Sequence, residues 1–199
     1  MADRPPLPSP AGDASDTVSV TEPGALRALF GAFATGVTVV TVAGPAPHGM
    51  TANSFASVSL DPPLALVCVG RDTTMYARLS SRRCFAVSVL DADQEHLARY
   101  FADPRRPTGA AQFAGVNWRA GPVTGAPLLA GALAWLECRL WRAYDGGDHV
   151  IVVGRILSAH RAGAPAALVF FGGHFGRLPV ADGPRPAVGV PAGRTTASG

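Results

Sequence analysis

Hydroxyl and amide side chains are concentrated between residues 50 and 63, in a stretch with few bulky side chains. Buried strands are usually dense in β-branched and aromatic residues, whereas this stretch offers Thr51, Asn53 and three serines. Small residues let a flat ligand approach the backbone, and hydroxyl, amide and main-chain N–H groups can bond to its oxygens. The stretch therefore predicts a binding surface for a flat polar ligand that carries a phosphate. A serine-rich loop between two strands is the alternative interpretation.

If this stretch is extended, alternate side chains share one face of a strand. One face would carry Thr51, Asn53, Phe55, Ser57 and Ser59, and the other would carry Met50, Ala52, Ser54, Ala56 and Val58. The first face would then hold the asparagine and most of the hydroxyl groups that could bond to a ligand.

A histidine follows a glycine-rich turn in the second half of the chain. The turn occupies residues 145–148, and His149 opens the β-branched run 150–153. Glycines leave room for a ligand, and histidine is the side chain whose charge changes near neutral pH. His149 is therefore a candidate catalytic residue, and a purely structural polar group is the alternative. The other histidines interpreted as surface residues are His48, His96 and His160.

A short helix is expected after residues 72–74, any of which can cap it. Backbone N–H groups at a helix N-terminus bind phosphate well, so Thr73 and Thr74 form a candidate phosphate site. A simple helix cap explains the same two threonines equally well. The chain has no G-x-G-x-x-G fingerprint and no P-loop, so a nucleotide would be bound without the two commonest phosphate loops.

The composition is that of a globular domain, with 199 residues that are 48% hydrophobic and 16% charged. All 17 basic residues are arginines, the net charge is +3, and the arginines are scattered along the chain. A nucleic-acid binder would cluster them on one face or helix. The two adjacent pairs, Arg82–Arg83 and Arg105–Arg106, are interpreted as solvated surface.

The cysteines and apolar segments indicate a reduced, cytoplasmic setting without a membrane span. Cys68, Cys84 and Cys138 are odd in number, fit no zinc spacing and lie in apolar runs. No uninterrupted apolar run is longer than that of Leu64–Val69, which is far too short to cross a bilayer. Residues 1–16 contain no apolar core, so no signal peptide is expected.

The hydrophobic pattern predicts a small antiparallel barrel that is mostly β. A helix is expected from Thr21 to Gly36, with Leu26, Leu29, Phe30 and Phe33 on one face. Asp91 and Gln94 form a capping-box pattern that opens another helix. Strands are expected at 37–42, 64–69, 84–90, 135–144, 149–158 and 167–171. The domain is expected to span residues 21–178, with disordered tails at 1–20 and 179–199.

Four segments of the chain carry a resemblance to a known family. The first is Gly49–Phe55 with Ser57–Ser59 and Pro62–Leu64, and the others are Phe33–Thr41, Gly147–Gly154 and Leu168–Leu178. In that order they resemble the flavin-binding signature, the first helix-to-strand junction, the GDH motif with its strand, and the last strand of the flavin reductase family. These proteins are the small reductase components of two-component flavin-dependent monooxygenases. Because the similarity runs in the expected order from about Leu26 to Leu178, it is more specific than any single motif.

The resemblance implies a flavin-binding split β-barrel that forms a homodimer with flavin near the interface. It implies an NAD(P)H:flavin oxidoreductase in which NADH or NADPH passes a hydride to N5 of FMN or FAD, and the reduced flavin serves a separate oxygenase. His149 would lie at the nicotinamide site as the catalytic residue. The cofactor-binding positions in the similar segments would be Gly36, Val37, Thr38, Thr51, Ala52, Asn53, Ser54, Ser57, Val58 and Ser59. Thr74 joins them as the candidate phosphate ligand at the helix N-terminus. Phe175 joins them because its ring could stack on a flavin, with packing in the core as the alternative. His174 departs from the family pattern, so no role is assigned to it.

Two other functions remain open on the sequence alone. One is a split-barrel oxidase of another substrate, such as a pyridoxine phosphate, although that site would need more basic residues for the substrate phosphate. The other is a flavin-binding module without catalysis. The flavin oxidoreductase needs no nucleophile, metal cluster or carboxylate pair, because its cofactors carry the redox chemistry.

Overall fold

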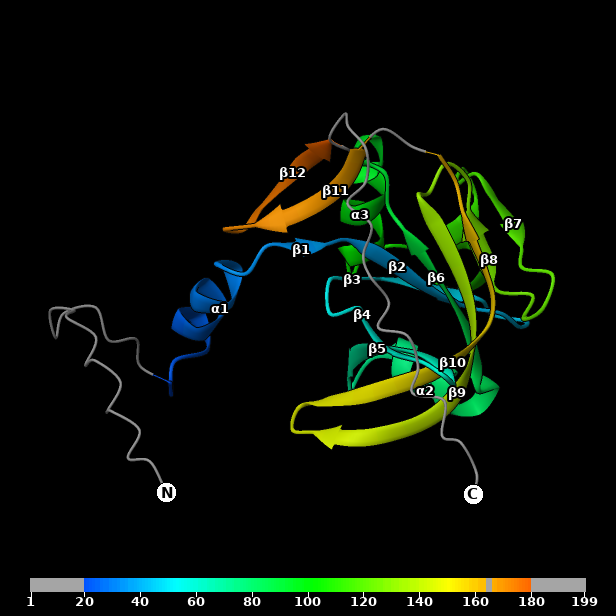
Figure 1. The fold of residues 1–199 in the computed structure, drawn as a ribbon, viewed down its shortest axis with the longest axis horizontal. Coiled ribbons are helices and arrows are strands. Elements are labelled where there is room, and N and C mark those ends of the chain that lie inside the picture. Colours follow the sequence, from blue (N-terminus) through cyan, green and yellow to red (C-terminus); the bar gives the residue numbers. More distant parts are fainter. Residues whose placement is uncertain (1–19, 164–165, 180–199) are drawn as a thin grey trace, which may run out of the picture.

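The computed structural model describes residues 20–163 and 166–179, and its main feature is a seven-stranded antiparallel sheet (Figure 1). In spatial order this sheet contains β3 (His48–Ala52), β2 (Thr38–Val42), β6 (Cys84–Val89), β9 (Ala134–Gly146), β10 (His149–Arg161), β5 (Pro63–Gly70) and β4 (Ala56–Leu60). A second sheet contains β1 (Thr35–Gly36), β11 (Ala166–Phe171) and β12 (His174–Pro179), and β7 (Trp118–Ala120) pairs with β8 (Pro127–Leu129). The α-helices are α1 (Pro23–Gly31), α2 (Thr74–Arg82) and α3 (Glu95–Ala102), and the 3-10 helices are η2 (Ala92–Gln94) and η3 (Gly109–Phe113).

The large sheet curls into a barrel because its two edge strands are consecutive in the chain. β3 and β4 lie at opposite edges of the sheet, yet only residues 53–55 separate them. Ser54 bridges the opening, since its Oγ accepts a hydrogen bond from Cys68 N at 3.0 Å and donates one to Cys68 O at 3.1 Å. The expected small antiparallel barrel is confirmed, and it is split between β3 and β4.

Apolar side chains of the strands fill the barrel interior. Phe85 on β6 is almost fully buried, in a cluster that also contains Met75 and Leu79 of α2. A Cβ at Gly154 on β10 would lie 2.5 Å from Cζ of Phe85, so only glycine leaves room for this ring. A second cluster, which includes Phe101 of α3, packs on the other side. The two clusters hold α2 and α3 against the barrel at the ends of β5 and β3.

The helix caps read from the sequence are confirmed for two of the three helices. Thr73 caps α2, since its Oγ1 accepts a hydrogen bond from Tyr76 N at 3.2 Å. Asp91 and Gln94 form the expected capping box ahead of α3. These caps place the start of α2 beside the end of β5, where the hollows described below are found.

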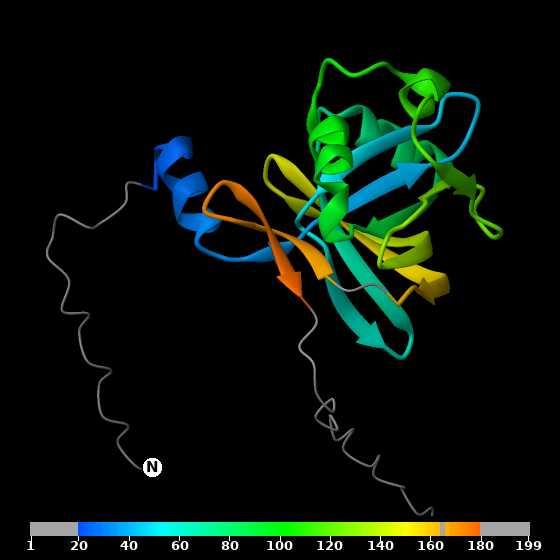
Figure 2. The same cartoon turned by 90° about the horizontal axis from the view of Figure 1, so that it is seen from above.

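The first helix is shorter than the pattern predicts. α1 begins after Glu22, which holds the N-cap position in place of Thr21, and the helix ends at Gly31. The prediction that Gly36 ends this helix is wrong, because Gly36 pairs with Val169 of β11 and belongs to β1. α1 lies outside the barrel beside the β11–β12 hairpin, and none of its residues is buried (Figures 1 and 2).

Three sequence expectations concern the tails, the membrane and the cysteines. The tails expected at 1–20 and 179–199 lie outside the described residues, apart from Val20 and Pro179. Within residues 20–163 and 166–179, no helix has the length and apolar character needed to cross a membrane. The three cysteines are free, and burial raises the pKa of the Cys138 thiol to about 12. Cys138 therefore acts as a small apolar residue.

Candidate functional site

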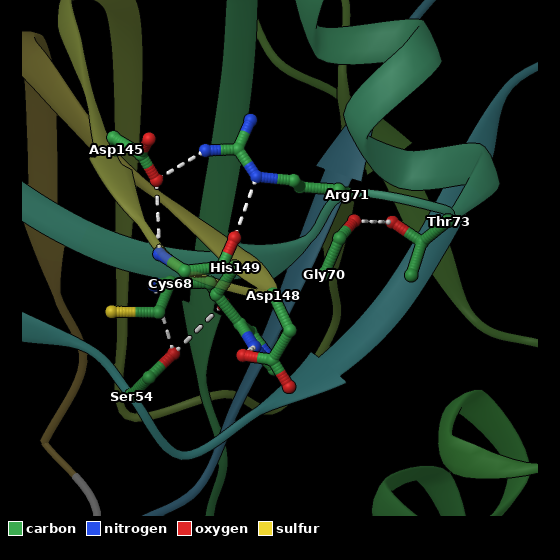
Figure 3. Close-up of polar contacts among 9 residues, drawn as sticks. Ser54, Cys68, Gly70, Arg71, Thr73, Asp145, Asp148 and His149 are labelled. Atoms are coloured by element: carbon green, nitrogen blue, oxygen red, sulfur yellow. Dashed lines mark hydrogen bonds and ion pairs between the residues drawn. The ribbon is translucent and has the colours of Figure 1, made fainter.

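A hollow of about 530 Å³ lies where the end of β3 meets the β5–α2 junction and the β9–β10 turn (Figure 3). Its walls include Thr51, Ala52, Asn53 and Ser54 from the serine-rich stretch and His149 from the start of β10. The structure thus brings together five of the residues that the sequence marked as a site.

A second hollow of about 440 Å³ adjoins the first, because both include Thr51 and Thr73 in their walls. It also includes Thr74, the first residue of α2, and Arg106. Thr73 is used internally as the helix cap and donates from Oγ1 to Gly70 O at 2.7 Å. The exposed Thr74 and the helix N-terminus are therefore the groups available to an anion at this end.

A third hollow of about 200 Å³ is mostly apolar and shares Thr51 and Asn53 with the first. Val37, Phe170 and Phe175 are also in its walls. The rings of Phe170 and Phe175 meet edge to face, with 5.2 Å between their centroids. Asn53 itself is exposed and lines both this hollow and the first, so its amide can reach a ligand placed in either.

His149 faces the serine-rich stretch from across the first hollow. Its Nδ1 lies 2.8 Å from Oδ1 of Asp148, and its side chain is half exposed. This hydrogen bond lowers the pKa of the Asp148 carboxyl. A Cβ built at Gly70 would lie 3.9 Å from Nε2 of His149 and 3.1 Å from Cγ2 of Thr73. The lack of a side chain at Gly70 therefore keeps the space beside the imidazole open.

Five predicted site residues lie away from the three hollows: Gly36, Thr38, Ser57, Val58 and Ser59. Thr38 is buried and donates from Oγ1 to Ala52 O at 2.7 Å, which ties β2 to β3. Residues 57–59 lie on the edge strand β4, beyond the 53–55 link. The condition for a single face across residues 50–59 is not met, because the chain leaves β3 at Asn53 to cross between the two edges of the sheet.

A buried polar cluster beside the second hollow was missed by sequence reasoning. Arg106 donates from Nη2 to Gly49 O at 2.6 Å and from Nη1 to Asp103 O at 2.7 Å, and its Nη2 lies 3.2 Å from Nε2 of His48. The surface interpretation is therefore wrong for Arg106 and for His48, which is 8% exposed. It is correct for Arg105, whose side chain is 88% exposed.

The charges in this cluster depend on burial. Burial is the main cause that lowers the pKa of His48 to about 4, and Arg106 and Arg78 lower it further. Burial also lowers the pKa of Arg106, against the opposing effect of Tyr100 and Asp103. His48 is therefore neutral at physiological pH, and Arg106 carries the positive charge of the cluster.

We expect His48 to make the fold sensitive to acid. The pKa of a histidine in the unfolded chain is about 6.5. Between pH 7 and pH 5 the unfolded chain therefore binds a proton that His48 in the folded protein does not bind. Its contribution to the free energy of unfolding should therefore fall by about 1–2 kcal/mol over this window. Urea unfolding of wild type and of His48→Gln at several pH values measures the difference. His96→Gln is the exposed control, and an equal pH dependence in His48→Gln and wild type would contradict the expectation.

Comparison with known proteins gives a consistent result. The family model for the flavin reductase like domain matches residues 30–179. The NADH-dependent FAD reductase of Streptomyces globisporus is 56% identical over 163 residues, which are 81% of this chain and 90% of the relative. The FMN reductase (NADH) SmoA of Agrobacterium fabrum is 46% identical over 154 residues, 76% of this chain and 84% of the relative.

Two solved structures are similar over most of the described fold. BorF, the flavin reductase component of a bacterial two-component tryptophan halogenase, is 56% identical with a TM-score of 0.78, over 80% of this chain and 100% of its own. The NADH:FAD oxidoreductase SgcE6 of Streptomyces globisporus C-1027, in complex with NAD and FAD fragments, is 52% identical with a TM-score of 0.78, over 82% of this chain and 96% of its own. The split-barrel fold implied by the sequence resemblance is thereby confirmed, and the chain belongs to the flavin reductase family.

Proposed function

We propose that this chain is an NADH:flavin oxidoreductase that supplies reduced flavin to a separate oxygenase or halogenase. The observation that carries the proposal is that His149 and residues 51–54 line one hollow in the fold of this family. The relatives named above support NADH as the donor, and the two FAD reductases, which are more similar to this chain than the FMN reductase SmoA, favour FAD as the flavin; the sequence alone left both choices open against NADPH and FMN.

The residues around the three hollows fit a flavin. Thr51, Ala52 and Asn53 offer a small, neutral surface with an exposed amide, and Phe175 supplies an apolar wall. At the other end, Arg106 carries a buried Nε that has no hydrogen-bond partner in the described part of the chain. That atom and the N-terminus of α2 beside Thr74 would hold a phosphate. The groove therefore suits a ring at its centre and an anion at one end.

His149 and the open space over Gly70 would receive the nicotinamide. When both are bound, the nicotinamide and the flavin supply the redox chemistry, in which a hydride passes to flavin N5. The work of this chain is to hold the two rings in contact and to keep water from the space between them. His149 would hydrogen-bond the nicotinamide nucleotide through Nε2, because Nδ1 is engaged by Asp148.

The two other functions considered from the sequence have less support. An oxidase of a phosphorylated substrate would need a second free cation besides Arg106, but the guanidinium of Arg71, the other arginine in the walls of these hollows, is bonded to Gly147 O and Asp145. A flavin-binding module without catalysis would have no use for an imidazole that faces the open space above Gly70. Both alternatives also lack a counterpart among the relatives described above.

The proposal is tested by NADH and NADPH oxidation with FMN, FAD and riboflavin supplied one at a time. We expect NADH with FAD to give the highest kcat/KM and NADPH to be a poor donor. Rapid mixing with NADH should bleach the absorbance of protein-bound oxidised flavin. A protein that binds flavin but leaves it oxidised under excess NADH would be a binding module, and the proposed activity would be refuted.

We further propose that the protein is a homodimer with flavin near the subunit boundary. Phe30 on α1 and Phe33, two residues beyond its end, are 68% and 75% exposed, and Val58 and Leu60 on β4 are 46% and 91% exposed. Exposed apolar surfaces of this kind mark protein interfaces. Their coverage by a second copy would bring Ser57, Val58 and Ser59 to the boundary, where these predicted flavin ligands could act.

Light scattering at low micromolar concentration should give twice the mass of the chain. The double variant Phe30→Glu/Phe33→Glu should dissociate the dimer without unfolding it, because neither ring is buried in the protomer. Val123→Glu changes an exposed apolar residue in another loop and serves as the control. A wild-type monomer that binds flavin normally would contradict the dimer.

A further inference from the structure

Arg71 connects two parts of the first hollow. It follows Gly70, the last residue of β5, and precedes the residues that start α2. Its backbone N–H donates to Asp148 O at 3.0 Å, its Nε donates to Gly147 O at 2.7 Å, and its Nη2 donates to Oδ1 of Asp145 at 2.5 Å. Figure 3 shows the guanidinium group lying over the turn that joins β9 to β10. One residue therefore bonds to three of the four turn residues 145–148.

The turn is otherwise exposed to solvent. The side chains of Asp145 and Asp148 are 82% and 93% exposed, and Gly147 has a φ of +76°. Its internal support is a hydrogen bond from Gly147 N to Oδ1 of Asp145 at 2.9 Å. The bonds from Gly147 and Arg71 both lower the pKa of the Asp145 carboxyl, so this acceptor is ionised at neutral pH. Besides the ladder pairs of Asp145 and Gly146 with β10 and of His149 with Gly70, the side chain of Arg71 ties this turn to the end of β5.

His149 takes its position from the same turn. It is the first residue of β10, it pairs with Gly70 across the ladder to β5, and its Nδ1 bonds to Asp148. Asp148 in turn accepts the backbone hydrogen bond from Arg71. Movement of the turn would therefore move both the imidazole and the carboxylate that orients it.

We propose that Arg71, together with Asp145, is a positioning residue that fixes the β9–β10 turn and thereby holds the imidazole of His149 over Gly70. The inference rests on the proposed function, in which His149 contacts the nicotinamide nucleotide. Arg71 positions the turn through the geometry of its two side-chain hydrogen bonds, and its positive charge is paired with the carboxylate of Asp145. A direct contact between the guanidinium and a phosphate of the nucleotide is the competing role.

Three variants separate these two roles. Arg71→Gln removes both the planar guanidinium and its charge. Asp145→Ala removes the carboxylate that Arg71 bonds, while Arg71 keeps its charge; these two are called the clamp variants, and the contacts of Arg71 with Asp145 and Gly147 are called the clamp. Arg71→Lys keeps the charge but cannot bond Gly147 O and Asp145 together as a planar fork does. Arg161→Gln removes the same charge at the far end of β10 and is the control.

With NADH as the donor, rapid-mixing reduction of bound flavin gives the first result. We expect Arg71→Gln, Arg71→Lys and Asp145→Ala each to lower the limiting rate by about three- to tenfold. Flavin affinity should change by less than about twofold, and Arg161→Gln should match wild type. The proposal is overturned if Asp145→Ala behaves like wild type while Arg71→Gln is impaired, or if Arg71→Lys restores the rate.

A second measurement needs neither flavin nor NADH. The histidine ring signals of the ¹³C-labelled protein can be assigned with His149→Gln, and the chain has only 5 histidines. The His149 signal should shift and broaden in Arg71→Gln and in Asp145→Ala, and it should stay in place in Arg161→Gln. An unchanged His149 signal in both clamp variants would overturn the proposal. If wild type failed to oxidise NADH, only the proposed function would fail, because this measurement would still decide the clamp.

Discussion

Replacement of Asn53 by leucine is expected to weaken flavin binding by roughly ten- to hundredfold while the barrel stays folded. Asn53 is exposed in the link between β3 and β4 and lines two adjoining hollows. Leucine has a similar size but offers no donor or acceptor, so one hydrogen bond to a buried ligand is lost, at a cost of about 1–3 kcal/mol. Titration of flavin fluorescence with the protein measures the affinity.

The chain offers a matched control in Asn117, its other asparagine, which is exposed and lies outside the hollows described above. Asn117→Leu should bind flavin like wild type. Circular dichroism and the urea midpoint of Asn53→Leu should stay near wild type, because the residue is not part of the buried clusters. Unchanged flavin affinity in Asn53→Leu would place the flavin site elsewhere.

The strands that could be predicted from the sequence are those whose own residues are β-branched and apolar, as in buried strands. Val37–Val42 and Val150–Val153 are β-branched, and the structure places β2 and β10 there. β12 (His174–Pro179) was not predicted, since it is mostly exposed and contains glycine and proline, and its pairing with β11 decides its conformation. Local patterns thus predict strands that face the core, and they miss exposed strands that are stabilised mainly by pairing with a neighbouring strand.

The break at Asn53 shows a different limit. Apolar and polar residues alternate from Met50 to Asn53 and again from Ala56 to Ser59, but the irregularity between these two runs does not show that they lie at opposite edges of a sheet. The break follows from barrel closure, because β3 and β4 occupy opposite edges of one sheet. Ser54 secures the crossing through Cys68, which is 14 residues away in the chain. A contact of this kind can be seen only when the sheet order is known.

The candidate site was partly predictable for the same reason. His149 and residues 51–54 could be singled out from their types and neighbours, and the fold brings them to one hollow. Arg106 and His48 looked like surface residues because their partners are 57 and 58 positions away. The contribution of Arg71 was equally hidden, since its acceptors are 74 and 76 residues further along the chain.

Substitution of His149 by alanine should slow flavin reduction by about ten- to hundredfold, which corresponds to about 1.4–2.8 kcal/mol. The imidazole stands at the edge of the first hollow, is half exposed and has Nε2 free to meet a ligand over Gly70. In the proposed function it acts on the nicotinamide nucleotide after flavin is in place. Flavin affinity should therefore stay near wild type, which distinguishes this variant from Asn53→Leu.

Rapid-mixing reduction across a range of NADH concentrations separates the two ways in which His149 could act. A lower limiting rate would show that the imidazole aligns the rings or assists proton transfer, and a higher half-saturation concentration would show that it binds NADH. His149→Gln places an amide near the position of Nε2, so it should recover part of the loss if a hydrogen bond from that atom is what NADH needs. His96→Ala, at an exposed position on α3, is the control and should reduce flavin like wild type. If His149→Ala matches wild type at every NADH concentration, His149 is a structural residue, and its place beside residues 51–54 has no part in hydride transfer.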